Sequence, residues 1–461
     1  MSLPSSLVLE SIRLYYQKGG SPFELFDHLY RRISLDQQEH GNVWISLRKQ
    51  SDIHSILERL IKSGPTDLPL WGIPFSVKDN IDVLDLPTTA ACPAFSYLPE
   101  QSATVVSKLE QAGAVCLGKT NLDQFATGLN GTRSPYGPCT SAFNSDFISG
   151  GSSSGSAVSV SLHQVCFSIG TDTGGSGRIP ASLNNVVGLK PTCGTLSTEG
   201  LVPCCPSVDC PSVFALSVAD AIEVASIALD SERPDASLRS DVQRSTFSLA
   251  PDDSVASILA PSDDDLEFFG NDEGKSLYLN FLCQLDQSGL ELKRFDFAPF
   301  HEAGNLLFDG PFIADRFSSI GEFVQSNQSS VLATTSTILS KATTVSGSDV
   351  FKALDRIKRL KSYVQSLVGP DSLFIFPTLA PLYTLSQLLE NPVDLNSNIG
   401  HYSYFANILD MSALSVPIGF YSNGMPFGVT LMGLPFRDSF LAQFAVSVLG
   451  VDNLSLGLSR S

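Results

Sequence analysis

Three residues carry side chains whose combination predicts nucleophilic catalysis: Lys78, Ser152 and Ser176. Lys78 ends the apolar run of GIPFSVKDN, Ser152 opens the serines of SGGSSSGSA, and Ser176 lies in GTDTGGSGRIP. A serine becomes a strong nucleophile when a base takes its proton, and a buried, uncharged lysine is able to act as that base. The pattern predicts that Lys78 activates Ser176 through Ser152. This is the chemistry of acyl transfer, most simply of amide hydrolysis.

Glycines surround the predicted nucleophile. Glycine leaves backbone N–H groups uncovered, so those of Thr173, Gly174, Gly175 and Ser176 are able to converge on one spot. Such donors hold the negative oxygen of a tetrahedral intermediate, which makes Thr173, Gly174 and Gly175 the candidate oxyanion hole. The alternative is an ordinary glycine turn with a capping serine.

Ser152 also has a purely structural interpretation. It is able to cap the helix that is expected to follow, although Ser153 or Ser154 would serve as well. The segment lacks the GxxxxGK[ST] pattern of a phosphate-binding loop and the GxSxG turn of a Ser-His-Asp hydrolase. A catalytic role for Ser152 therefore depends on Lys78. The alternative interpretation of Lys78 is that it forms a surface ion pair with Asp79 or Asp82.

Alternating helices and strands must position these residues. An apolar run predicts a strand that ends at Lys78, and the next helix leads into a buried strand over Ala114–Leu117. A further helix begins near Gly155, and a short strand over Val165–Ile169 precedes the turn of Ser176. This alternation predicts an α/β fold, one large domain whose sheet is covered by helices on both faces. The Ser- and Asp-rich residues 231–264 are expected to form a surface excursion.

Composition excludes several classes of protein. The 461 residues are 43% hydrophobic and 16% charged, as in a well-packed globular protein, and the net charge of −18 disfavours direct binding to nucleic acid. No uncharged run is long enough for a membrane-spanning helix, and the amino terminus lacks a signal-peptide pattern. The nine scattered cysteines predict neither a disulfide framework nor a zinc site. We expect a cytoplasmic protein that uses no metal or other cofactor.

The segment from about residue 70 to residue 214 resembles the amidase signature family. The resemblance rests on GIPFSVKDNID, ATVVSKLEQAGAVCLGKTNLDQFATG, ISGGSSSGSA and GTDTGGSGRIPASLNNVVGLKPT. It implies a single amidase domain over residues 1–461, with a helical region to about 65, the signature core at about 70–214 and a remainder that completes a mixed sheet and the substrate pocket. It also implies that Lys78 is the base, that Ser152 bridges and follows a cis peptide bond, and that Ser176 is the nucleophile.

Further segments, such as VPCCPSVDCPSVFA and MPFGVTLMGLPF, are similar to the branch of the family that hydrolyses allophanate (urea-1-carboxylate) with release of ammonia. That likeness implies a role in urea degradation and nitrogen metabolism, a homodimer, and a small-molecule substrate held by Gly128, Phe308 and Arg316. Full-length members add a carboxy-terminal domain that handles the product. Since this chain ends at Ser461, that activity is expected either to have been trimmed away or to lie elsewhere.

One position departs from that branch. A tyrosine there stands eight residues before the arginine, and both contact the substrate; here the arginine is Arg316 and the tyrosine position is Phe308. The loss of one hydroxyl donor leaves open another small amide as the substrate. A second alternative is the A-type subunit of a tRNA-dependent amidotransferase, which belongs to the same family.

Overall fold

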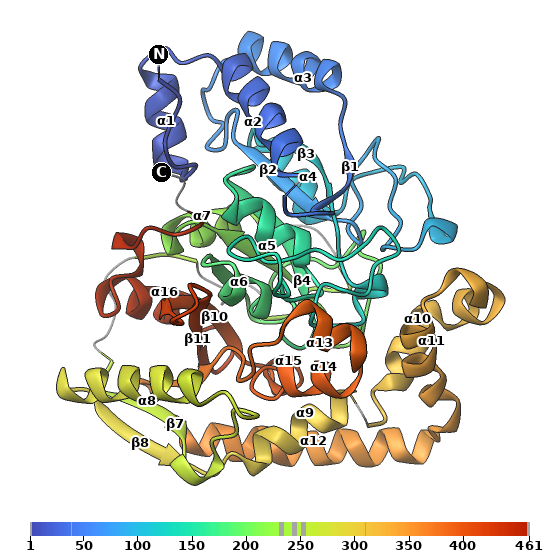
Figure 1. Cartoon of the computed structure of the whole chain (residues 1–461), viewed down its shortest axis with the longest axis vertical. Helices are drawn as coiled ribbons and strands as arrows, with labels where there is room; N and C mark the ends of the chain where they lie inside the picture. The colour runs from blue at the N-terminus through green and yellow to red at the C-terminus, as the bar shows by residue number, and fades with distance from the viewer. Residues whose placement is uncertain are drawn as a thin grey trace.

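An 11-stranded sheet runs through the computed structural model, which describes residues 2–37, 39–229, 235–241, 247–249, 255–308 and 310–458. The strands lie in the order β1-β3-β2-β4-β6-β5-β10-β11-β9-β7-β8 (Figure 1). Their bounds are β1 Trp44–Leu47, β2 Pro74–Lys78, β3 Val115–Thr120, β4 Phe167–Asp172, β5 Val187–Lys190, β6 Cys210–Ala215, β7 Ser257–Pro261, β8 Glu291–Phe295, β9 Ser372–Pro377, β10 Ser412–Phe420 and β11 Pro426–Gly433.

The sheet is mixed, as the resemblance implied. Strand β2 pairs in parallel with β3 and β4, and β7 pairs in parallel with β8 and β9. The remaining pairs are antiparallel, including β4 with β6. Strand β2 lies between two parallel neighbours, a setting in which both faces of a strand are covered by other elements, and all five of its residues are buried. Lys78 is thereby delivered to the buried end of an interior strand.

Helices cover the sheet in two groups. Helix α5 contacts β2 and β4 and lies beside α6, while α7 contacts β5 and β6 and lies beside α16. The expected α/β architecture is therefore confirmed. The helices span α1 Leu9–Gln17, α2 Pro22–Asp36, α3 Gln50–Ser63, α4 Thr104–Gln111, α5 Ser154–Ser161, α6 Ile179–Leu183, α7 Val218–Ala228, α8 Asp272–Gln287, α9 Ala298–Phe308, α10 Ile313–Ser326, α11 Ala333–Ser340, α12 Gly347–Leu367, α13 Leu385–Glu390, α14 Asp394–Ile399, α15 Phe405–Ile408 and α16 Asp438–Ser447.

Small residues let α5 approach the sheet closely. All eight of its residues are buried, and a Cβ at Gly155 would lie 2.2 Å from the backbone oxygen of Val43. The Ser76 hydroxyl, which faces this helix, bonds to Ser159 at 3.0 Å and to Ser168 of β4 at 2.8 Å. The serine-rich sequence after Ser152 is thus a helix fitted to a polar strip of the sheet.

Two expectations about the elements were wrong in detail. Strand β4 covers Phe167–Asp172 and not Val165–Ile169, because its polar end pairs with β6 as far as Asp172 opposite Cys210. Within residues 231–264, the parts 231–234, 242–246 and 250–254 lie outside the described residues. Its final part is no excursion, since Ser257–Pro261 forms the buried strand β7.

Helices α10 and α11 stand to one side of the sheet (Figure 1). A separate apolar cluster, which includes Phe125, Ile320 and Leu339, fixes them to the loops that precede the nucleophile. The amino- and carboxy-terminal segments lie side by side near α1 (Figure 1), where one cavity is lined by residues of both, namely Ser5, Ser6, Val8, Asp452, Leu454, Ser455, Leu456 and Leu458. Across the described ranges, no helix combines the length and apolar character that crossing a membrane requires.

The stack of Phe75 on Phe167 is predicted to hold β2 against β4. The rings lie 5.1 Å apart at 14°, and both side chains are fully buried. We expect Phe167→Ala to lower the free energy of unfolding by about 3–5 kcal/mol, measured by urea denaturation. The matched control is Phe351→Ala on α12, where the ring is 74% exposed and the expected change is within about 0.5 kcal/mol. Equal losses in the two variants would contradict this account of the core.

Candidate active site

Lys78 lies in the interior and its amine meets two hydroxyl groups. Its side chain is 0% exposed, and Nζ donates to Ser152 Oγ at 2.8 Å and to Thr171 Oγ1 at 2.7 Å. The surface ion pair considered as an alternative is not formed, because Asp79 lies 3.4 Å from Lys119 instead. The amine is thus buried with neutral hydrogen-bond partners.

Ser152 connects Lys78 to Ser176. The Ser152 hydroxyl donates to Ser176 Oγ at 3.0 Å, so the two serines and the amine form one continuous hydrogen-bonded chain. The peptide bond between Gly151 and Ser152 is cis. Ser153 points elsewhere, and its hydroxyl donates to the backbone oxygen of Thr171 at 3.0 Å. The geometry therefore places Ser152, and not Ser153, between the other two groups.

Burial changes the protonation of this amine. Removal from water lowers the pKa of Lys78 to about 8, although Cys204, Asp123, Asp209 and Asp172 each favour the charged form. A group with that pKa has an appreciable neutral fraction near pH 7, whereas an exposed lysine has almost none. The uncharged amine is therefore available to accept a proton.

A buried ion pair holds the loop around Ser176. Asp172 accepts hydrogen bonds from the N–H groups of Gly175 at 2.8 Å and Gly177 at 2.9 Å, and Arg178 Nε donates to it at 2.9 Å. Burial opposes the charge of Asp172, but Arg178, Lys190 and the Gly175 N–H together outweigh burial and lower the pKa of this carboxyl. Both side chains are 0% exposed. These two charges therefore hold the loop in place.

This arrangement affects the candidate oxyanion hole of Thr173, Gly174 and Gly175. The Gly175 N–H already donates to Asp172, so it is not free for a substrate oxygen. The Thr173 hydroxyl donates to Asp209 at 2.5 Å. In the described part of the chain, the N–H groups of Thr173, Gly174 and Ser176 have no hydrogen-bond partner. The expectation for Gly175 needs correction for this reason.

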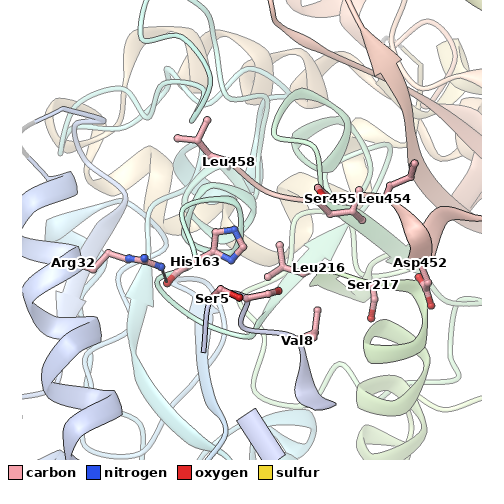
Figure 2. Close-up of a pocket in the computed structure, with 12 residues that line it drawn as sticks. Ser5, Val8, Arg32, His163, Leu216, Ser217, Asp452, Leu454, Ser455 and Leu458 are labelled. Carbon is pink, nitrogen blue, oxygen red and sulfur yellow. Dashed lines mark hydrogen bonds between the residues drawn. The ribbon is translucent and has the colours of Figure 1, made fainter. Parts of the chain in front are cut away.

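The expected substrate contacts lie together in a separate small cavity. Gly128, Phe308 and Arg316 line a space of about 40 Å³, with Thr127, Asn396 and Tyr404. Such a volume suits a ligand of few atoms. A cavity of about 440 Å³ near the termini, lined by Arg32, His163 and Asp452 among others, shares no residue with it (Figure 2).

Arg316 is a buried cation held against aromatic rings. Its side chain is 1% exposed, its Cζ lies 4.2 Å above the centre of the Phe308 ring, and its buried Nε and Nη2 find no hydrogen-bond partner among the described residues. Tyr404 stacks on Phe308 with ring centres 3.7 Å apart. A Cβ on Gly174 would lie 2.5 Å from the Phe308 ring, so the nucleophile loop adjoins this cavity. Two unsatisfied donors in a buried guanidinium suit a carboxylate ligand.

Sequence reasoning missed several residues of this site. Thr171 bonds directly to Lys78, and its position at the end of a strand parallel to β2 was a usable signal. Asp209 lies within the segment VPCCPSVDCPSVFA, but nothing in that segment indicates its role, and Tyr404 comes from a distant part of the chain. Over the described ranges, no group of three or more His, Cys, Asp or Glu side chains is placed to bind a metal ion.

Comparison with known proteins agrees with this geometry. The family described as Amidase matches residues 24–441. Urea amidolyase of Saccharomyces cerevisiae is 40% identical over 409 residues, which cover 88% of this chain and 22% of that protein. The A-type subunit of Glutamyl-tRNA(Gln) amidotransferase from Synechococcus sp. is 31% identical over 461 residues, 92% of each chain. This chain thus spans about a fifth of the length of the urea amidolyase that it matches.

Solved structures have the same fold. The chain superposes on Kluyveromyces lactis Allophanate Hydrolase with a TM-score of 0.87 and 36% sequence identity, covering 98% of this chain and 75% of that one. The K. lactis Urea Amidolyase gives a TM-score of 0.86 at 37% identity, covering 96% of this chain and 27% of that one. The match to the family extends over most of the sequence, including all three residues of the hydrogen-bonded chain. This chain belongs to the amidase family.

Proposed function

We propose that this protein hydrolyses allophanate with release of ammonia. The observation that carries the proposal is the continuous chain from Lys78 Nζ through Ser152 Oγ to Ser176 Oγ, at 2.8 and 3.0 Å, beside a small cavity with a buried arginine. The likeness to allophanate hydrolase and urea amidolyase supports this choice of substrate.

In the first half of the proposed reaction, Ser176 Oγ attacks the carbonyl carbon of the terminal amide. The proton of Ser176 passes to Ser152, whose own proton passes to the neutral amine of Lys78. A carbon–oxygen bond forms, and the carbonyl electrons move to the oxygen. Protonated Lys78, acting through Ser152, then protonates the leaving nitrogen, so ammonia departs and an acyl-enzyme remains.

In the second half, water replaces ammonia and the same groups act in reverse. Lys78, through Ser152, takes a proton from water as its oxygen attacks the acyl carbon. The carbon–oxygen bond to Ser176 then breaks, and the proton returns to Ser176 Oγ. We assign the oxyanion to the N–H groups of Thr173, Gly174 and Ser176, since Gly175 already bonds to Asp172. Each well-placed donor of this type contributes about 3–4 kcal/mol to the transition state.

Arg316 is proposed to bind the substrate carboxylate, because its two unsatisfied donors match a carboxylate fork. Gly128 is proposed to let its backbone approach the substrate. Phe308 offers no hydroxyl, so it is assigned a packing role beneath Arg316. A different small carboxylated amide is the corresponding alternative substrate.

A second candidate function is that of an amidotransferase A-type subunit. The identity of 31% to such a protein over 92% of both chains favours it. The higher identity to urea amidolyase and the buried Arg316 weigh against it. Release of ammonia from allophanate by the isolated chain, without glutamine or partner proteins, distinguishes the two functions.

We also propose that residues 1–461 form one amidase domain that acts as a cytoplasmic homodimer. All nine cysteines are free thiols, which suits a reducing compartment. The family resemblance supports the dimer, and light scattering of the purified protein is the direct check.

The proposed function predicts a preference for allophanate and a requirement for Ser176. We expect ammonia release from allophanate to exceed that from biuret, malonamate or a simple uncharged amide. Ser176→Ala should lower kcat for allophanate by about 10⁴-fold or more, because the acyl-enzyme is not formed.

Arg316→Met should raise KM for allophanate by about tenfold or more, since the carboxylate loses its partner. The measurement is steady-state ammonia production.

The control for this comparison is Ser386→Ala, an exposed serine on α13, which should keep native rates. Native turnover by Ser176→Ala would refute the assigned nucleophile. Equal efficiency with the uncharged amide would refute the assigned role of Arg316.

The pH dependence follows from the lowered pKa of Lys78. The base is active when neutral, so kcat/KM should fall about tenfold for each unit of pH below about 8 and level off above it. Lys78→Arg should be inactive at every pH, because a guanidinium stays charged. A native profile that is flat from about pH 6 to about pH 9 would exclude Lys78 as the base.

A further inference from the structure

The segment 204–209 lies between the nucleophile loop and helix α10, and it bonds to both. At one end, Asp209 Oδ1 accepts the Thr173 hydroxyl at 2.5 Å. Its Oδ2 accepts the N–H groups of Cys204 at 2.8 Å and Cys205 at 3.0 Å. The Asp209 residue is 7% exposed. One buried carboxylate thus closes the segment on itself and ties it to the first residue of the nucleophile loop.

The other end of the segment is tied to α10. Asp315 Oδ2 accepts the thiol of Cys205 at 3.0 Å and the N–H of Ser207 at 3.0 Å. Asp315 immediately precedes Arg316 on the helix. These bonds therefore fix the turn of α10 that presents the buried guanidinium.

Asn407 adds a third link. Its Nδ2 donates to the backbone oxygen of Asp172 at 2.7 Å and to that of Val208 at 3.0 Å. The backbone before the nucleophile and the backbone of segment 204–209 thus share one amide donor, which holds them at a fixed distance.

We propose that segment 204–209 sets the distance between the nucleophile and the arginine that holds the substrate, with Asp209 positioning the loop of Ser176 and Asp315 positioning Arg316. This inference rests on the proposed function. Neither carboxylate bonds to the chain of Lys78, Ser152 and Ser176, so both are positioning residues. The bonds of Asp209 lie among buried groups and are rigid, whereas those of Asp315 are part-buried to Cys205 and exposed to Ser207. A displacement of about 1 Å in an active site is able to lower the rate about 10²-fold.

Asp209 also acts on the base through its charge. Asp209 favours the charged form of Lys78, as do Asp172, Asp123 and Cys204. Burial raises the pKa of the Asp209 carboxyl to about 6, while the Thr173 hydroxyl and Arg316 favour its ionised form. Removing the charge of Asp209 should therefore lower the pKa of Lys78 and move the acid limb of the rate profile to lower pH.

The test compares Asp209→Ala with Asp315→Ala in steady-state hydrolysis of allophanate. Asp209→Ala should lower kcat about 10²-fold with KM within about threefold of native, because the nucleophile loop is misplaced. Asp315→Ala should raise KM about tenfold with kcat within about threefold, because Arg316 is misplaced. Asp355→Ala, an exposed residue paired with Arg359 on α12, is the matched control and should behave as native.

Asp209→Asn keeps the shape of the side chain and tests the proposal even where Asp209→Ala does not fold. It should recover part of kcat and shift the acid limb to lower pH. Identical changes of kcat and KM in the two alanine variants, or a raised KM with native kcat in Asp209→Asn, would overturn the proposal.

Labelling of Ser176 by a sulfonyl fluoride separates this proposal from the proposed function. If the native enzyme is labelled but does not hydrolyse allophanate, the substrate assignment fails while the positioning proposal is still tested. The labelling rate should then fall in Asp209→Ala and stay native in Asp315→Ala. The opposite ranking of those rates would overturn the positioning proposal.

Discussion

The burial of one amine among hydroxyl groups governs the chemistry of this protein. Lys78 is fully enclosed, yet its two hydrogen-bond partners are the neutral side chains of Ser152 and Thr171. An adjacent carboxylate would stabilise the ammonium ion and remove the base. The nearest charged neighbour along the chain, Asp79, is instead paired with Lys119. The fold thus pairs the neighbouring carboxylate with another lysine and leaves the Lys78 amine bonded to hydroxyl groups.

A buried ion pair near Lys78 holds the nucleophile loop without bonding to the amine. Asp172 and Arg178 form a buried pair that holds the loop of Ser176 through backbone N–H groups. A buried pair of this type gives little net stability, but removing one partner leaves an uncompensated charge and is strongly destabilising. The ion pair serves here to position the loop of Ser176, because it fixes the loop without any charged group bonding to Lys78.

Much of this could be predicted from the sequence, for identifiable reasons. Lys78, Ser152 and Ser176 stand at strand ends or in glycine-rich turns, where local patterns indicate both structure and chemistry. The substrate side was harder, because Arg316 and Phe308 were recognised by resemblance alone, and Tyr404 stacks on Phe308 from almost a hundred residues further along the chain. The end of β4 was misjudged since its last residues are polar, and only pairing with β6 makes them a strand. The occupied N–H of Gly175 depends on a side-chain bond that spacing does not reveal.

The chemistry requires that Lys78 is uncharged in about one tenth of the molecules at pH 7, far more than for an exposed lysine. The most direct measurement is an NMR titration of the enzyme labelled with ¹³C in its lysine side chains, with Lys78→Met used to assign the signal. We expect the Lys78 signal to titrate with a midpoint at about pH 8. A midpoint near about pH 10, as for an exposed lysine, would contradict it.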